Sequence, residues 1–165
     1  MLRPHFIVEI ARALKNRHIN IGVDTCGYVP LANLRQVLPY TDFFLWDIKH
    51  MDPEVHRKLT GVSNELILNN ARFVADQKIP LYIRLPLIKG YNDSEENIRA
   101  TCEFASGLTS LEEVNLLPLH HLGKARYESL DRPYPLQDVP LIGIGTLQEM
   151  ERLVKSYRLR CRIVG

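Results

Sequence analysis

An acid and a base, Asp47 and Lys49, stand two residues apart at the end of an apolar run over residues 43–49. The residues before them are aromatic or aliphatic and favour a buried β-strand. Side chains two positions apart on a strand point to the same face, so the carboxylate and the ammonium should lie side by side. The pair can be a structural ion pair, or it can be chemistry presented at the carboxyl end of a strand, as in many α/β folds.

Three other predicted strands carry polar side chains in a comparable place. Asp24 and Thr25 end one strand, Arg84 lies within another, and His120 follows a fourth. Because the carboxyl ends of parallel strands share one edge of a sheet, we expect these groups to meet the acid–base pair there. Carboxylate and hydroxyl oxygens suit a hard cation, whereas Lys and Arg suit a ligand that bears a carboxylate. Each residue alone also has a plain explanation: a turn cap, a buried ion pair or a loop histidine.

The elements that must position these groups alternate along the chain. Apolar periodicity and turn residues predict strands over 19–23, 43–49, 81–87, 114–118 and 160–164, and helices that begin near residues 4, 31, 53, 63, 93 and 146. Alternation at this spacing predicts an α/β fold with an open, mostly parallel sheet and flanking helices, since five strands are too few to close an eight-stranded barrel. Residues 1–165 are expected to form a single domain.

Two expectations about the helices are specific enough to check against a structure. The first helix should bury an apolar stripe of Phe6, Ile7, Ile10 and Leu14. Two later helices should begin with capping boxes, formed by Asp93 with Glu96 and by Thr146 with Glu149.

The composition is ordinary for a globular protein, with 45% hydrophobic and 24% charged residues and a net charge of +2. The charges are interspersed, so we expect no nucleic-acid or membrane surface. No apolar run approaches the length of a membrane span. Three widely spaced cysteines, Cys26, Cys102 and Cys161, are most simply explained by a reducing cytoplasm.

Five short segments form an ordered set that covers almost the whole chain. They are 24–28 (Asp-Thr-Cys-Gly-Tyr), 46–49 (Trp-Asp-Ile-Lys), 59–64 (Leu-Thr-Gly-Val-Ser-Asn), 84–88 with 90–93, and 116–120 with 122–124. In this order and spacing they resemble the glycyl radical enzyme activating enzymes, radical S-adenosylmethionine enzymes of the pyruvate formate-lyase activase type. One such segment would be a weak indication, but five in register are a strong one.

The resemblance implies both a fold and a site. The fold would be an incomplete portion of a TIM-like (β/α)6 partial barrel. The site would bind S-adenosylmethionine through the residues at three matching positions, Lys49, Arg84 and His120. It would hold a monovalent cation near the carboxylate of that cofactor through three more, Asp24, Thr25 and Asp47.

The resemblance also implies an activity and partners. In the parent family a 4Fe–4S cluster drives reductive cleavage of S-adenosylmethionine, and the resulting radical takes a hydrogen atom from a glycine of a target such as pyruvate formate-lyase. The implied partners are therefore a glycyl radical enzyme and an electron donor of the flavodoxin or ferredoxin type.

Two family segments have no counterpart in this chain. The family holds its cluster with a Cys-x-x-x-Cys-x-x-Cys loop and binds the amino group of the cofactor with a Gly-Gly-Glu-Pro stretch, and neither occurs here. The three cysteines of the chain lack a spacing suited to a cluster. We therefore expect a truncated portion of the family that carries no cluster, binds S-adenosylmethionine weakly and is inactive alone, so no catalytic residue is assigned.

Two alternative interpretations remain open from the residues alone. Asp47, Lys49 and Asp52 fit the Asp-x-Lys-x-x-Asp pattern of cofactor-free barrel decarboxylases. An incomplete barrel would also expose sheet edges and apolar faces, which is typical of a non-catalytic interaction module.

Overall fold

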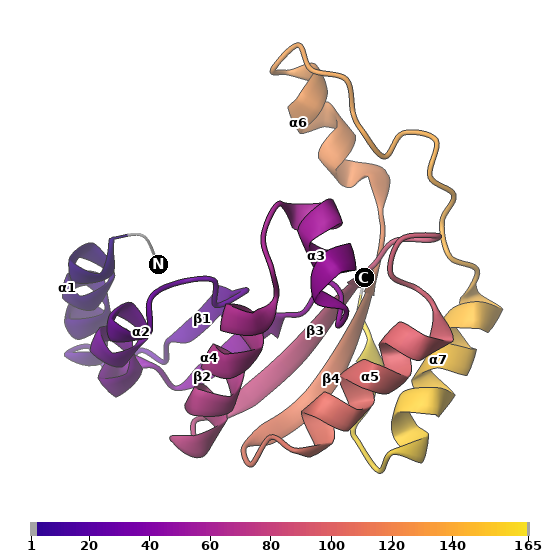
Figure 1. Ribbon diagram of the computed structural model, residues 1–165. Helices are drawn as coiled ribbons and strands as arrows, with labels where there is room; N and C mark the ends of the chain where they lie inside the picture. Colours follow the sequence, from indigo (N-terminus) through magenta and orange to yellow (C-terminus); the bar gives the residue numbers. More distant parts are fainter. Residues whose placement is uncertain (1–2, 165) are drawn as a thin grey trace.

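The structure, a computed structural model, describes residues 3–164 as a sheet flanked by helices (Figure 1). Residues 1, 2 and 165 of the predicted domain lie outside the described part. The strands are β1 (Gly22–Thr25), β2 (Phe43–Asp47), β3 (Leu81–Leu87), β4 (Leu111–Pro118) and β5 (Cys161–Ile163). The helices are α1 (Pro4–Lys15), α2 (Leu31–Val37), η1 (Leu38–Tyr40), α3 (Pro53–Thr60), α4 (Glu65–Asp76), α5 (Glu95–Ser106), η2 (His121–Gly123), α6 (Lys124–Glu128) and α7 (Ile144–Ser156).

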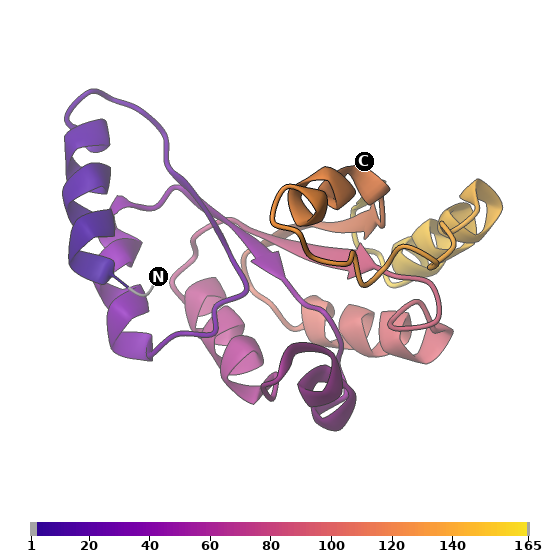
Figure 2. The same cartoon turned by 90° about the horizontal axis from the view of Figure 1, so that it is seen from above.

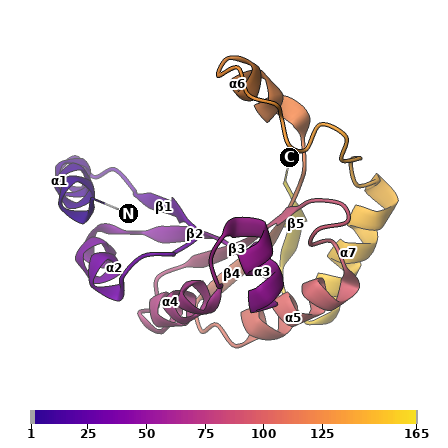
Figure 3. The same ribbon diagram turned by 45° about the horizontal axis from the view of Figure 1, so that its top comes forward.

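The five strands form one sheet in the order β1-β2-β3-β4-β5, and each neighbouring pair is parallel. This arrangement confirms the predicted open, parallel α/β sheet. Helices α2, α4, α5 and α7 follow the outer side of the curved sheet, whereas α3 and α6 stand near the carboxyl ends of the strands (Figure 3). No helix between residues 3 and 164 is both long enough and apolar enough to cross a membrane.

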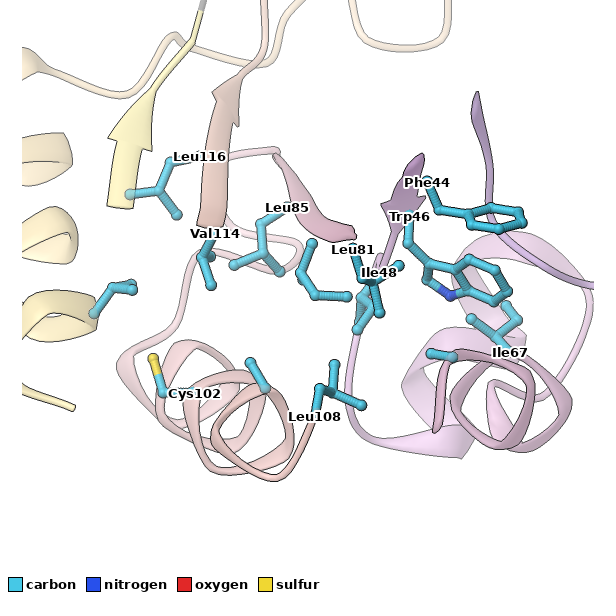
Figure 4. Packing of buried hydrophobic residues seen from close by; sticks show 14 of the residues in the cluster. Phe44, Trp46, Ile48, Ile67, Leu81, Leu85, Cys102, Leu108, Val114 and Leu116 are labelled. Carbon is cyan, nitrogen blue, oxygen red and sulfur yellow. The ribbon is translucent and has the colours of Figure 1, made fainter. Parts of the chain in front are cut away.

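The core lies between the sheet and the helices on its outer side. Alternate residues of β3, such as Ile83 and Leu85, are fully buried, and the residues between them are only partly buried. On β2 the same alternation buries Phe44 and Trp46, which pack with Ile67 of α4 (Figure 4). Because alternation is strict, the polar residues at the intervening positions face the opposite, inner side of the sheet. The sheet thus separates its apolar core from a polar face.

The apolar stripe predicted for α1 is only partly buried, since Ile7 and Leu14 are half-buried but Phe6 and Ile10 are exposed. Phe6 is 64% exposed and Ile10 is 45% exposed, and Ala11 is the residue of α1 that is buried. The side chains of Phe6 and Ile10 are exposed because α1 lies at the β1 end of the molecule, where it packs against α2 (Figure 2). The first strand also begins later than predicted, at Gly22 rather than at residue 19.

Both predicted capping boxes are wrong. Ser94 is the N-cap of α5 and its hydroxyl accepts a hydrogen bond from the Asn97 amide, while Asp93 accepts one from Gly90 N. Thr146 lies inside α7, which begins after Gly143 without a side-chain cap. The observed N-cap residues lie one and three residues from the predicted ones. The sequence pattern does not fix the start of a helix this closely.

Candidate functional site

The guanidinium of Arg84 joins the carboxylates of two neighbouring strands. Its Nε donates to Asp47 Oδ1 at 2.7 Å, and its Nη1 donates to Asp24 Oδ2 at 2.9 Å. Its Nη2 contacts both carboxylates. The register explains this, since Arg84 lies directly beside Asp47 and Asp24 lies one strand further, beside Leu45. The sheet therefore brings together three of the predicted site residues.

Charge compensates for the burial of this guanidinium. Its side chain is 17% exposed, and burial lowers the pKa of Arg84. Hydrogen bonds and charges from Asp24 and Asp47 outweigh that effect, so the pKa of Arg84 is raised overall. Arg84 is consequently a permanent cation held between two acids.

Lys49 completes the group at the carboxyl end of β2. Its Nζ lies 3.2 Å from Asp47 Oδ2, so Asp47 uses one oxygen for Arg84 and the other for Lys49. The side chain of Lys49 is 39% exposed. An ammonium carries three donors, and the contact with Asp47 engages one of them. Lys49 can therefore bind an anionic group of a ligand without leaving Asp47.

Thr25 has a different setting from Asp24. It pairs with Trp46, whose side chain faces the core, and its Oγ1 accepts a hydrogen bond from Gly27 N at 2.9 Å. The turn after β1 packs tightly against Trp46. Gly27 has a φ of +71°, and a Cβ at that position would lie 1.9 Å from Trp46 Cζ2. Asn70 of α4 holds the same turn by donating to the carbonyls of Gly27 and Val29, both at 2.8 Å.

Two clefts open at the carboxyl ends of the strands. Lys49 lines one of about 580 Å³, whose wall includes three tyrosines, Tyr91, Tyr127 and Tyr134. His120 is exposed, precedes η2 as its N-cap residue and lines a second cleft of about 400 Å³. Pro86 and Ile88 line both clefts. The structure therefore places His120 after β4, the strand beside β3, and in a different cleft from Lys49.

Known proteins are similar to this chain in sequence. The chain is 34% identical over 160 residues to the choline trimethylamine-lyase activating enzyme of Oleidesulfovibrio alaskensis, which covers 95% of this chain and 52% of that protein. It is 34% identical over 162 residues to the trans-4-hydroxy-L-proline dehydratase activating enzyme of Clostridioides difficile, which covers 97% of this chain and 53% of that protein. No family model matches the chain.

One solved structure matches this chain over nearly the whole length of both chains. A domain of the pyruvate-formate lyase-activating enzyme of Bacteroides vulgatus superposes with a TM-score of 0.84 at 32% identity, over 99% of this chain and 92% of that one. The chain belongs to the glycyl radical enzyme activating enzymes. It spans about half the length of the curated relatives it matches. The fold is accordingly a partial TIM-like α/β barrel of the radical S-adenosylmethionine type, as predicted.

The cysteines of this activating-enzyme chain do not fit a 4Fe–4S cluster. All three are free thiols, and burial raises the pKa of Cys102 to about 11 and that of Cys161 to about 12. Cluster ligands must be thiolates, and burial of Cys102 and Cys161 opposes the loss of their protons. Within residues 3–164 no group of three or more His, Cys, Asp or Glu side chains is arranged to hold a metal ion.

Asp52, the third residue of the decarboxylase pattern, serves as a helix cap. Its carboxylate accepts hydrogen bonds from Glu54 N and Val55 N, both at 2.8 Å, and these bonds lower the pKa of Asp52. Asp52 thus has a structural role in α3, and the family to which the chain belongs is not that of the decarboxylases. The interaction-module alternative stays a prediction.

Sequence reasoning missed the buried asparagines that support the site. Asn64, Asn70, Asn92 and Asn97 are each at most 4% exposed. A signal was present, because Asn64 and Asn92 belong to two of the family-like segments, 59–64 and 90–93. Their role depends on contacts between distant segments, which the sequence does not reveal.

Proposed function

We propose that this chain is part of an activating enzyme that uses S-adenosylmethionine and a 4Fe–4S cluster to generate a glycyl radical on a target enzyme. The observation that carries the proposal is the Asp24–Arg84–Asp47–Lys49 cluster at the strand ends of a chain that belongs to this family. Reductive cleavage of the cofactor would supply the radical that removes hydrogen from the target glycine. Because the cysteines here do not fit a cluster, residues outside this chain would hold it, and the chain alone would be inactive.

In this proposal the residues of the chain bind and orient the cofactor. Lys49 offers its free donors to the cofactor's carboxylate, and Arg84 fixes the orientation of Asp47 beside it. His120 would contact the cofactor from the other side of β3. Lys49, Arg84 and His120 thus act as binding groups rather than as proton donors.

The proposed monovalent cation would lie among Asp24, Thr25 and Asp47. Supporting it are the carboxylates of Asp24 and Asp47 on adjacent strands, oxygen donors that suit a hard cation. The Thr25 hydroxyl lies on the core side of the sheet and accepts from Gly27 N, so the structure gives this third residue less support. The guanidinium of Arg84 now lies between those carboxylates, so a cation there would share or replace its contacts.

The remaining parts of the proposal concern its setting. The partners would be a glycyl radical enzyme and a flavodoxin- or ferredoxin-type electron donor, with no nucleic acid and no membrane. Residues 1–165 would act as one domain. Three free thiols favour the reducing cytoplasm.

The first test is the DNA in frame upstream of the Met1 codon. We expect it to encode Gly-Gly-Glu-Pro and, further upstream, Cys-x-x-x-Cys-x-x-Cys. The longer protein, reconstituted with iron and sulfide, should then form 5′-deoxyadenosine from S-adenosylmethionine, and Lys49→Met should raise the KM for the cofactor at least about tenfold, the loss of one charge-assisted bond. A stop codon with no such segment would remove the enzymatic proposal for this chain.

A further inference from the structure

The segment that carries Lys49 is held by asparagine side chains rather than by the sheet. Three buried asparagines from three different elements bind its backbone: Asn92 after β3, Asn64 before α4 and Asn97 in α5. Asn92 Nδ2 donates to the carbonyl of Lys49 at 2.9 Å and to that of Pro86 at 2.6 Å. Its Oδ1 accepts from Ile88 N at 2.7 Å. Both hydrogens and the oxygen of this amide are therefore used.

The reason for this arrangement is a proline in β3. The last backbone bond that ties the end of β2 to β3 runs from Ile48 N to Arg84 O, at 2.9 Å. In a parallel pair the next bond would run from the N–H of residue 86 to the carbonyl of residue 48. Residue 86 is Pro86, which has no N–H, so the ladder stops there. Asn92 joins the two strands just beyond that point.

The other two asparagines extend the same support along the segment. Asn97 Oδ1 accepts from Met51 N at 2.8 Å, and its Nδ2 donates to the carbonyl of Asn92, also at 2.8 Å. Asn64 Nδ2 donates to the carbonyls of His50 and Met51 at 3.0 and 2.6 Å. A buried amide that satisfies several backbone groups defines one conformation, because any other leaves polar groups unpaired.

We propose that Asn92 is a positioning residue for Lys49, fixing the backbone from which the ammonium reaches Asp47 and the cleft. The value of that position for cofactor binding rests on the proposed function, whereas the positioning itself does not. Asn92 acts through Lys49 and has no role in the chemistry of its own.

The experiment compares Asn92→Asp with the unmodified chain. Asp keeps the oxygen that accepts from Ile88 N but sets a carboxylate oxygen against the carbonyls of Lys49 and Pro86. Reductive methylation gives Lys49 a ¹³C-dimethyl-lysine NMR signal, which is assigned by its loss in Lys49→Arg. Asp47→Asn shows where this signal lies when Lys49 lacks the Asp47 carboxylate. Amide hydrogen exchange of Met51 reports on the backbone.

We expect Asn92→Asp to move the Lys49 signal toward its position in the Asp47→Asn protein. The Met51 amide should exchange about tenfold faster or more, as expected for lost buried hydrogen bonds. Val154→Ala, a buried substitution on α7, controls for lost stability and should move neither signal. Asn69→Asp, an added charge at an exposed position of α4, should also move neither.

Two results would overturn the inference: unchanged Lys49 and Met51 signals in Asn92→Asp, or equal changes in Val154→Ala. If Asn92→Asp does not fold, Asn97→Asp keeps the bond from Met51 N and disturbs only the contact with the Asn92 carbonyl, and it should give a smaller change in the same direction. Cofactor contact is scored separately. If Lys49→Met leaves the KM of the longer, reconstituted protein for S-adenosylmethionine unchanged while Asn92→Asp still displaces the Lys49 signal in this chain, the positioning stands and the cofactor role of Lys49 fails.

Discussion

Arg84 binds Asp24 across an intervening strand, with two nitrogens of the guanidinium facing the two oxygens of the carboxylate. The same guanidinium binds Asp47 on that intervening strand. The two acids differ in exposure, since the side chain of Asp24 is 60% exposed and that of Asp47 is 19% exposed. Water can therefore replace Arg84 at Asp24 more readily than at Asp47.

This asymmetry predicts unequal costs of substitution. Arg84→Met should lower the free energy of unfolding by about 2 kcal/mol, because Asp47 loses a partner where water is scarce. Asp24→Asn should lower it by less than about 1 kcal/mol, as for an exposed ion pair. Urea denaturation of both variants checks this, and Arg84→Met combined with Asp47→Asn should recover part of the loss. Equal losses in the two single variants would contradict the asymmetry.

Arg84→Met also tests the proposed binding of a monovalent cation. Without the guanidinium, the carboxylates of Asp24 and Asp47 repel one another, and a small cation at that place would relieve the repulsion. Arg84→Met should therefore gain more thermal stability from potassium or sodium chloride than from choline chloride at equal concentration. The unmodified chain, with Arg84 in place, should show a smaller difference. If the ions act alike on Arg84→Met, the proposed monovalent cation site is wrong.

The turn after β1 predicts a contrast between two glycines. Gly27 and Gly90 both have positive φ, of 71° and 78°, but a Cβ would enter the Trp46 ring at Gly27 and meets nothing within 4 Å at Gly90. Gly90→Ala should cost about 1 kcal/mol, the conformational penalty alone. Gly27→Ala should cost at least about 2 kcal/mol, because overpacking of Trp46 is added. Chemical denaturation measures both, and similar costs would mean that the Trp46 ring moves aside.

The pattern of apolar and polar residues along the chain predicted the strands and their buried faces, but not the contacts between distant segments. The alternation in β2 and β3 sets which residues are buried and leaves Asp47 and Arg84 among the partly buried ones, and the pairing of the two strands then brings them side by side. The exposure of Phe6 and Ile10 on α1 could not be foreseen, because they have the periodicity of a buried face whether or not anything packs on it. The support of Lys49 by Asn92 could not be foreseen either, since those residues are 43 positions apart and meet only when β2 and β3 pair.

The thiols of Cys102, which is buried, and Cys161, which is partly buried, predict a decline of stability in alkali. Burial raises the pKa of Cys102 to about 11 and that of Cys161 to about 12, from an ordinary value of 9.0. Above pH 9 the unfolded chain releases these protons while the folded chain keeps them, so the free energy of unfolding should fall as pH rises. Below pH 9 both states keep the protons, and the thiols should contribute no slope.

Removing the thiols tests their share of that decline. Cys102→Ala with Cys161→Ala should flatten the fall in unfolding free energy between pH 9 and pH 11, measured by urea denaturation at each pH. The double variant will also lose packing, which shifts the whole curve but not its slope. Val154→Ala, which removes buried carbon without a titratable group, should keep the slope of the unmodified chain. An equally steep decline in the double variant would mean that other groups cause the alkaline loss.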